Sequence, residues 1–184
     1  MKRSKLFYAL LLSTSILFCA CGGNADNDGT ENGENLSGDG ADSVEISSVE
    51  YASLFEGHKL TMINVWATFC GPCIDEMPDL GEIASEYADK GLQIVGIPVD
   101  VLNQDGSISE EMVATAKEIV ASTGANYLHI LPAADNYALL AQSMYVPTTF
   151  FFDEEGNQLG ESYVGSRSKA DWTAIIDELL ESQS

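Results

Sequence analysis

The sequence is short of basic residues. Its 184 residues include only 8 lysines and arginines against 29 aspartates and glutamates, a formal net charge of −21 at pH 7. From residue 26 to residue 50 there are eight acidic residues and no lysine or arginine. Because contacts to phosphate need positive charge, this composition excludes nucleic acid as a partner. The negative charge instead indicates a solvated surface, which anionic lipid headgroups would repel.

Long apolar runs are absent except near the N-terminus. There, three basic residues precede the apolar run 6–18, which is long enough for a secretory signal and too short for a membrane span. Ala20 before Cys21 resembles the processing site of a bacterial lipoprotein, although Phe18 stands where leucine is usual. We therefore expect a signal peptide over 1–20 and a lipidated Cys21. An ordinary cleaved signal peptide is the alternative.

Residues 22–43 contain almost no large apolar side chains and consist mainly of Gly, Asn, Asp, Glu, Ser and Thr. Such a segment cannot bury enough surface to offset its ordering entropy. We expect an acidic, flexible tether over 21–43, with a root-mean-square span of about 25 Å. It would connect a membrane anchor at Cys21 to a folded domain over 44–184. This predicts an extracytoplasmic protein attached to the bacterial cell membrane; without lipidation, the same composition would be a plain disordered terminus.

Cysteine is scarce as well, with four residues. Removal of the signal and lipidation of Cys21 would leave one pair, Cys70 and Cys73, so a disulfide scaffold is excluded. A disulfide across so short a loop would stabilise a domain little, which favours a catalytic use. Pro72 and a helical pattern follow Cys70, so free backbone N–H groups and the helix dipole would favour its thiolate. We expect Cys70 to be the exposed nucleophile and Cys73 the more buried resolving thiol.

Zinc binding is the competing interpretation of this pair. The sequence has two histidines, His58 and His129, so a Cys2His2 ligand set is available by count. The pair, however, follows an apolar strand and opens a helix in a domain large enough to need no structural metal. This context favours redox chemistry, and we expect no metal.

The folded part, about 140 residues, is long enough for one domain with its own core. The continuous apolar run 60–66 indicates a strand buried on both faces, as in the centre of an α/β sheet. A capping box at Ser107 and Glu110 would start an inserted helix, and Gly124 would end it. Trp172 would face the core from the last helix. The predicted strands are 60–66, 92–99, 127–131, 148–153 and 158–164, and the predicted helices are 73–88, 107–124, 135–144 and 169–180.

The run 66–73, Trp-Ala-Thr-Phe-Cys-Gly-Pro-Cys, followed by Glu76, resembles the active site of the thioredoxin superfamily. Within it, the run is most similar to the TlpA/ResA-like extracytoplasmic thiol-disulfide oxidoreductases. The segment 146–148, Val-Pro-Thr, resembles the cis-proline loop of that family, and Gly165 a glycine found there. The resemblance implies an α/β thioredoxin fold, with a central mixed β-sheet flanked by helices and a TlpA-like helix-strand insertion.

The resemblance also implies roles for residues around the cysteines. A cis Val146–Pro147 bond would bring the Val146 backbone beside Cys70, where it could pair with an extended substrate strand. A proline that merely starts a strand is the alternative. Phe69 would form the lip of the substrate groove.

Glu76 is the third catalytic candidate, and its role is open. It is matched by a glutamate in the TlpA/ResA-like group and could be a proton shuttle, a substrate contact or an ordinary first-turn glutamate. Thioredoxin has a buried aspartate six residues before its first active-site cysteine. Here that position is Asn64, which cannot titrate.

The function implied by the resemblance is thiol-disulfide exchange without a cofactor, carried out by a monomer. The protein would reduce disulfides or oxidised thiols of clients such as apocytochrome c or a methionine sulfoxide reductase, and a CcdA/DsbD-like membrane donor would recharge it. Gly71-Pro72 matches reducing thioredoxins. One alternative is a thiol oxidase that donates disulfides. Another is a metal chaperone, for which the cysteine spacing is one residue short. No Thr-x-x-Cys peroxidase motif is present.

Overall fold

The computed structural model describes residues 44–183. The expected signal peptide, the lipidated Cys21 and the tether all lie outside the described residues. Between residues 44 and 183, no helix has the length and apolar character needed to cross a membrane.

A mixed six-stranded sheet with the order β1-β4-β3-β2-β5-β6 forms the centre of the described domain. The first four strands in this order run parallel, β5 is antiparallel to β2, and β6 is antiparallel to β5. The mixed sheet predicted from the sequence is thereby confirmed. The strands are β1 (Ile46–Ser47), β2 (Leu60–Trp66), β3 (Leu92–Pro98), β4 (Leu128–Ile130), β5 (Thr148–Phe152) and β6 (Tyr163–Val164).

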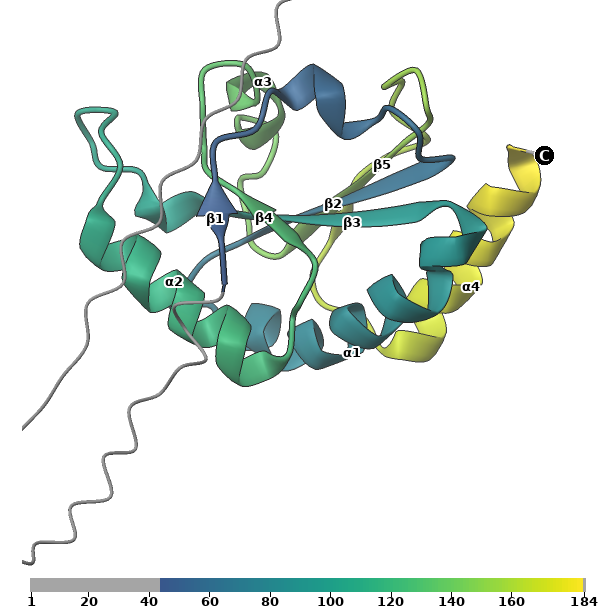
Figure 1. Cartoon of the computed structure of the whole chain (residues 1–184), viewed down its shortest axis with the longest axis horizontal. Coiled ribbons are helices and arrows are strands. Elements are labelled where there is room, and N and C mark those ends of the chain that lie inside the picture. Colours follow the sequence, from purple (N-terminus) through teal and green to yellow (C-terminus); the bar gives the residue numbers. More distant parts are fainter. Residues whose placement is uncertain (1–43, 184) are drawn as a thin grey trace, which may run out of the picture. The chain divides into compact units, whose positions relative to one another are not determined.

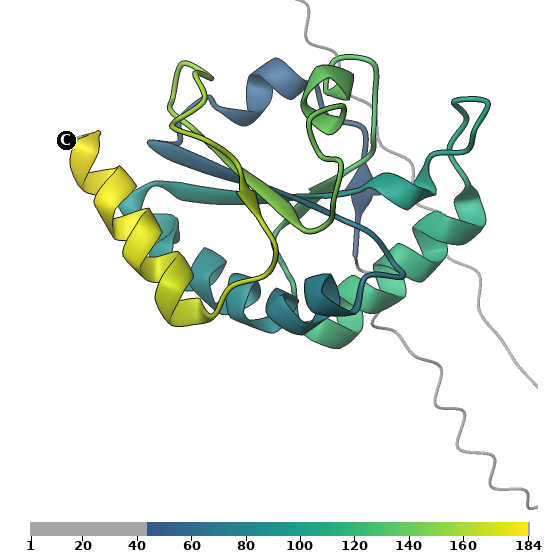
Figure 2. The same ribbon diagram turned by 180° about the vertical axis from the view of Figure 1, so that it is seen from behind.

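Helices cover both faces of this sheet (Figures 1 and 2). Three long helices lie along one face, α1 (Gly71–Tyr87), α2 (Glu110–Thr123) and α4 (Lys169–Ser182). The short α3 (Tyr137–Leu140) and the 3-10 helix η1 (Tyr51–Leu54) lie over the other face. Every residue of β2 is buried, as its continuous apolar run predicts. The expected inserted helix and strand are α2 and β4.

Side chains alternate between the two faces along β2. Met62 packs in a cluster with residues of α1 and α4, whereas Ile63 and Val65 pack in a cluster with Leu139 of α3. Asn64 shares the parity of Met62, so it faces α1. One amide side chain therefore lies within the apolar layer between the sheet and the helix that follows the cysteines.

The start of α2 differs from the prediction. Its N-cap is Ser109, whose hydroxyl accepts a hydrogen bond from the N–H of Met112 at 3.3 Å. The capping box predicted at Ser107 is wrong, because Asp105 accepts hydrogen bonds from the N–H and hydroxyl of Ser107 in the preceding loop. The predicted end at Gly124 is confirmed: this residue has φ 69°, a conformation that glycine adopts without strain.

Two predicted elements are shorter than expected. The helix predicted over 135–144 is only the single turn of α3. After it, the N–H groups of Gln142 and Ser143 donate to the carbonyls of Leu139 and Leu140, three residues back, so the α-helical pattern does not continue. The strand predicted over 158–164 pairs continuously only as β6, with an isolated bridge at Gln158.

The parallel strands bring several loops to one edge of the sheet. Trp66 at the end of β2 lies opposite Pro98 at the end of β3, and Val65 lies opposite Thr148 at the start of the antiparallel β5. Thr148 in turn lies opposite Val164 of β6. We call this edge, where the parallel strands end, the carboxyl edge. It carries the loops after β2, β3 and β4, the segment before β5 and the end of β6.

Candidate active site

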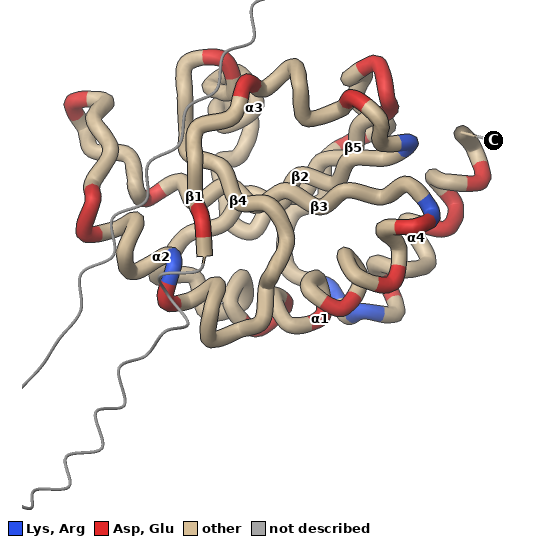
Figure 3. The backbone as a smooth tube through the Cα atoms, in the orientation of Figure 1, with Lys and Arg blue, Asp and Glu red and all other residues tan. Residues whose placement is uncertain are grey.

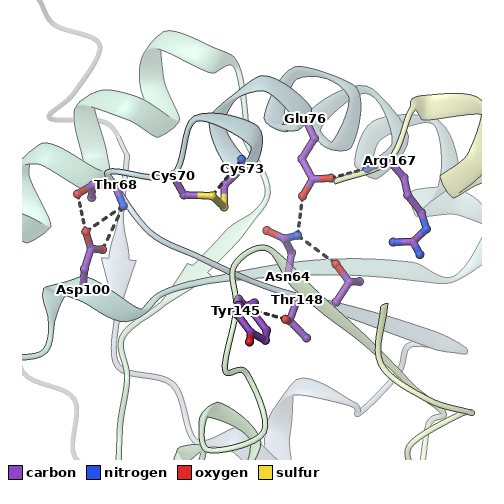
Figure 4. The surroundings of a disulfide bond; sticks show 10 residues. Asn64, Thr68, Cys70, Cys73, Glu76, Asp100, Tyr145, Thr148 and Arg167 are labelled. Atoms are coloured by element: carbon purple, nitrogen blue, oxygen red, sulfur yellow. Dashed lines mark hydrogen bonds between the residues drawn. A yellow bond between two sulfur atoms is a disulfide. The ribbon is translucent and has the colours of Figure 1, made fainter. Parts of the chain in front are cut away.

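Cys70 and Cys73 lie at the carboxyl edge, where β2 passes into α1 (Figure 4). Their sulfurs form a disulfide of 1.99 Å, with the Cα atoms 5.3 Å apart. Cys70 is the N-cap of α1, and its Sγ accepts a hydrogen bond from the N–H of Cys73 at 3.2 Å. Pro72 occupies the first turn, where its missing N–H leaves no bond unmade. The helix start thus gives Cys70 the electropositive surroundings that stabilise a thiolate.

The two cysteines differ in exposure in the predicted order. Cys70 is 6% exposed and Cys73 is fully buried. The expectation that Cys70 is exposed needs correction for this oxidised state, because both cysteines pack in an apolar cluster with Met77 and the half-buried Val146. Only one edge of the disulfide is therefore open to an incoming sulfur.

The loop before β5 lies against this cluster. Its Val146–Pro147 peptide bond is cis, as predicted. The Thr148 hydroxyl donates to the carbonyl of Tyr145 at 2.6 Å, and the N–H of Gly165 donates to the carbonyl of Pro147 at 2.9 Å. Both flanks of the cis bond are thus fixed by hydrogen bonds, and the loop has a defined position beside the disulfide (Figure 4).

A carboxylate holds the turn that leads into Cys70. Asp100, which follows β3 in the 3-10 helix η3 (Val99–Val101), accepts the N–H of Thr68 with its Oδ1 at 3.2 Å and its Oδ2 at 3.0 Å. The Thr68 hydroxyl also donates to Oδ2, at 2.5 Å. Sequence reasoning missed this clamp. The available signal was an aspartate just after a strand parallel to β2, because the carboxyl ends of parallel strands meet.

Glu76 lies one helical turn after Cys73 and is only 3% exposed. Its Oε1 accepts from Nδ2 of Asn64 at 3.0 Å, and its Oε2 accepts from the backbone N–H of Arg167 at 3.1 Å and from Nε1 of Trp172 at 3.3 Å. Burial raises the pKa of this carboxyl, although the hydrogen bonds act in the opposite direction. So buried a group fits neither a solvent-facing first-turn glutamate nor a direct substrate contact. The proton-carrying role stays a prediction.

Distant segments supply the partners of Glu76. Asn64 also donates to the hydroxyl of Thr149 on β5 at 3.1 Å and so ties the carboxyl to the sheet. Trp172 faces the core, as predicted, but its hydrogen bond to Glu76 was not foreseen. The guanidinium of Arg167 lies 5.1 Å from the centroid of the Trp172 ring. Arg167 and Trp172 stand more than 90 residues from Glu76, so no local pattern could have revealed these two contacts.

The outer side of the site carries exposed apolar residues. Phe69, next to Cys70, is 78% exposed, and Met144 and Tyr145, just before the cis bond, are also exposed. The exposure of Phe69 is compatible with the lip of a substrate groove, which stays a prediction.

His129 of β4 lies apart from the site chemistry. It is buried, its Nε2 lies 3.1 Å from the carbonyl oxygen of Ala125, and its ring stacks on Tyr127. Burial lowers its pKa to about 4. The ring packs directly on Gly96, where a Cβ would collide with Nδ1. In the described part of the chain, no three or more His, Cys, Asp and Glu side chains form a group that could hold a metal ion.

A strand leading into a Cys-x-x-Cys helix start, a neighbouring cis-proline loop and a helix-flanked mixed sheet define a thioredoxin-fold protein with a dithiol site. The model of the AhpC/TSA family matches residues 35–157, and the chain belongs to this family. The predicted superfamily and fold are thereby confirmed.

Individual relatives agree with this assignment. Thiol-disulfide oxidoreductase ResA of Oceanobacillus iheyensis is 42% identical over 60 residues, which cover 33% of this chain and only 30% of that relative. Thioredoxin-like protein YneN of Bacillus subtilis is 28% identical over 136 residues, which cover 73% of this chain and 74% of the relative. A crystal structure of a thiol:disulfide interchange protein from Chlorobium tepidum TLS superimposes with a TM-score of 0.57 at 28% identity, covering 70% of this chain and 84% of that one.

Proposed function

We propose that this protein is a thiol-disulfide oxidoreductase that reduces disulfides or oxidised thiols of client proteins outside the cytoplasm. The observation that carries the proposal is the Cys70–Cys73 disulfide at the positive end of α1, beside the cis Val146–Pro147 loop. The similarity to ResA of Oceanobacillus iheyensis and to the interchange protein of Chlorobium tepidum supports it.

The reaction begins from the reduced dithiol. The Cys70 thiolate attacks one sulfur of a client disulfide, a mixed disulfide forms, and the other client sulfur leaves as a thiolate that takes up a proton. The deprotonated Cys73 then attacks the Cys70 sulfur and releases the second client thiolate. Two electrons pass to the client, and the Cys70–Cys73 disulfide results. With a sulfenylated client, the first attack releases water instead.

Three neighbours assist this exchange. Glu76 accepts the proton of Cys73 before the second attack; its burial, its raised pKa and its place one helical turn from Cys73 support this role. The backbone of Val146, held by the cis bond to Pro147, pairs with an extended client segment. Phe69 forms the lip of the client groove.

Turnover needs electrons from a second protein. The Cys70–Cys73 disulfide is reduced again by a CcdA/DsbD-like membrane thiol transporter, and the clients are proteins such as apocytochrome c or a methionine sulfoxide reductase. A lipidated Cys21 keeps the enzyme at the membrane that holds this donor, and the tether raises the local concentration of one for the other.

The reduction potential of the Cys70/Cys73 pair tests the proposal. We expect a value near the thioredoxin end of the scale, about −270 mV, when the thiols are trapped and counted in glutathione or dithiothreitol buffers. A value near about −120 mV would make the protein a thiol oxidase. Cys73→Ser should trap mixed disulfides at Cys70, and Cys70→Ser, the matched control, should trap none. A pair that exchanges with neither buffer would overturn the proposal.

A further inference from the structure

The exposed large apolar side chains of the described residues share a relation to the carboxyl edge. All of them belong to segments that begin or end at the carboxyl edge, which also holds the disulfide. They are Phe69, Tyr137, Met144, Tyr145 and Val164. Large apolar side chains gathered on one exposed side of a soluble domain are typical of a contact surface.

A small apolar pocket opens at the same edge. The loop after η3 and the segment between β4 and α3 enclose a cavity of about 250 Å³. This is smaller than the roughly 300–1,000 Å³ of pockets that hold organic ligands, and it suits one large side chain. Its walls include Leu102, Pro132, Ala133, Ala134, Tyr137 and Leu140.

Negative charge borders the pocket on both sides. Asp105 stands beside its Gly106 wall, and Asp135 lies between Ala134 and Tyr137; both side chains are exposed. Hydrogen bonds from Ser107 lower the pKa of Asp105, so this group is charged at neutral pH. The segments 99–109 and 131–147 contain no lysine or arginine, and the loops beside α3 and before α2 carry only acidic charge (Figure 3).

The pocket is within reach of a client held at the cysteines. Leu140 in its wall is six residues before Val146, a separation of at most about 20 Å along the chain. An extended client segment of six residues spans the same length. A side chain about six residues from the reacting client cysteine can therefore enter the pocket while the client backbone lies beside Val146.

We propose that this pocket is a second client subsite, which binds a large apolar side chain of an extended polypeptide with lysine or arginine next to it. This proposal rests on the proposed function and adds a sequence preference to it. The apolar walls bind the side chain, and Asp105 and Asp135 attract the neighbouring basic residues. Such a subsite selects unfolded or extended client segments, because folded proteins bury their large apolar side chains.

The test uses the reduced protein with Cys73→Ser, Cys19→Ser and Cys21→Ser, so that Cys70 is the only thiol left to attack. The probes are extended peptides whose single cysteine is blocked as a nitrothiobenzoate disulfide; attack on the cysteine sulfur joins the peptide to Cys70 and releases the coloured thiol. One peptide carries Phe six residues from the cysteine between two lysines, a second carries Ser in place of Phe, and a third carries Glu in place of the lysines. Cysteine alone, blocked in the same way, is the small probe.

We expect the Phe peptide to react about tenfold faster than the Ser peptide at sub-saturating concentration, as burial of one aromatic side chain predicts. Ala133→Phe, which fills the pocket from its exposed rim, should bring this ratio to about one. Ala88→Phe, an exposed site in the 3-10 helix Ala88–Lys90 that precedes β3 at the opposite edge, should leave all the rates unchanged. Asp135→Asn retains an oxygen to accept the N–H of Tyr51 and should reduce the preference for lysine over glutamate.

The outcomes separate the two proposals. Equal rates for the Phe and Ser peptides, or a ratio that survives Ala133→Phe, would overturn the subsite while the reaction with the small probe still supported the proposed function. No reaction of Cys70 with any probe would overturn the proposed function itself.

Discussion

Polar side chains are usually exposed and apolar ones buried, but both sides of the disulfide depart from this distribution. On the inner side, toward the sheet and α4, polar groups are buried: Asn64, Glu76 and Thr149. On the outer side, toward solvent, apolar groups are exposed: Phe69 and Tyr145. A buried carboxyl group lowers the stability of a protein, and clustered exposed aromatics lower its solubility. Both features therefore indicate a function where they occur. The reversal on both sides of one dithiol therefore marks the site independently of its cysteines.

The two sides also differ in how they contribute to the fold. Each carboxylate oxygen of Glu76 accepts at least one hydrogen bond, and a buried polar group that loses such a partner costs about 1–3 kcal/mol. Outer side chains such as Phe69 bury little surface and can be removed at little cost. Stability should therefore respond to changes on the inner side and client reactivity to changes on the outer side.

The largest expected difference between the two sides comes from truncating one aromatic side chain on each. Trp172→Ala removes a fully buried ring and a hydrogen-bond donor to Glu76, and it should lower the free energy of unfolding by about 3–5 kcal/mol. Phe69→Ala should lower it by less than about 0.5 kcal/mol. Urea denaturation of the oxidised domain measures both values.

A second substitution separates the cavity from the hydrogen bond. Trp172→Phe removes the N–H donor to Glu76 but leaves a smaller cavity than Trp172→Ala does, so it should cost less than Trp172→Ala. Equal losses for Phe69→Ala and Trp172→Ala would show that the two sides do not differ in this way.

The next test asks whether Glu76, on the inner side, takes up the proton of Cys73. Glu76→Gln should slow the attack by Cys73 on the order of 100-fold, a typical contribution of a positioned base, and leave the first attack by Cys70 nearly unchanged. Single-turnover kinetics with a client peptide disulfide resolve the two steps. Glu86→Gln, an exposed position on the same helix, removes the same charge and should change neither step.

The raised pKa of Glu76 determines the direction in which folding stability changes with pH. Burial raises its pKa above the usual value of 4.5 for a glutamate, so the folded state binds this proton more tightly than the unfolded state does. The resulting stabilisation is complete below about pH 4.5 and is lost as the pH rises through the folded pKa. The stability of the wild type relative to Glu76→Gln should therefore fall as the pH rises. An unchanged rate profile in Glu76→Gln would leave the residue a purely structural role.

The sequence predicted the parts of this site that depend on local patterns. The apolar run of β2, the helix start at Cys70 and the motif around Pro147 each lie within a few residues, and the structure agrees on all three. The partners of Glu76 and the clamp of Asp100 on Thr68 join segments that only the folded sheet brings together. The two serines before α2 compete for the same cap, and local spacing alone did not show that Asp105 engages Ser107.

The smallest expected effect concerns His129, whose contribution to stability changes with pH in the direction opposite to that of Glu76. Its pKa is lowered from 6.5 to about 4 by burial, so below about pH 6.5 the unfolded chain binds a proton that the folded chain does not. The stabilisation from the neutral ring is present above this pH and falls by about 2 kcal/mol by about pH 5. His129→Gln should remove this part of the slope in urea denaturation. If the variant keeps the wild-type slope, the carboxyl groups alone account for acid sensitivity. If it loses the slope, the two buried groups act in opposite directions, because Glu76 disfavours the folded state as the pH rises and His129 as it falls.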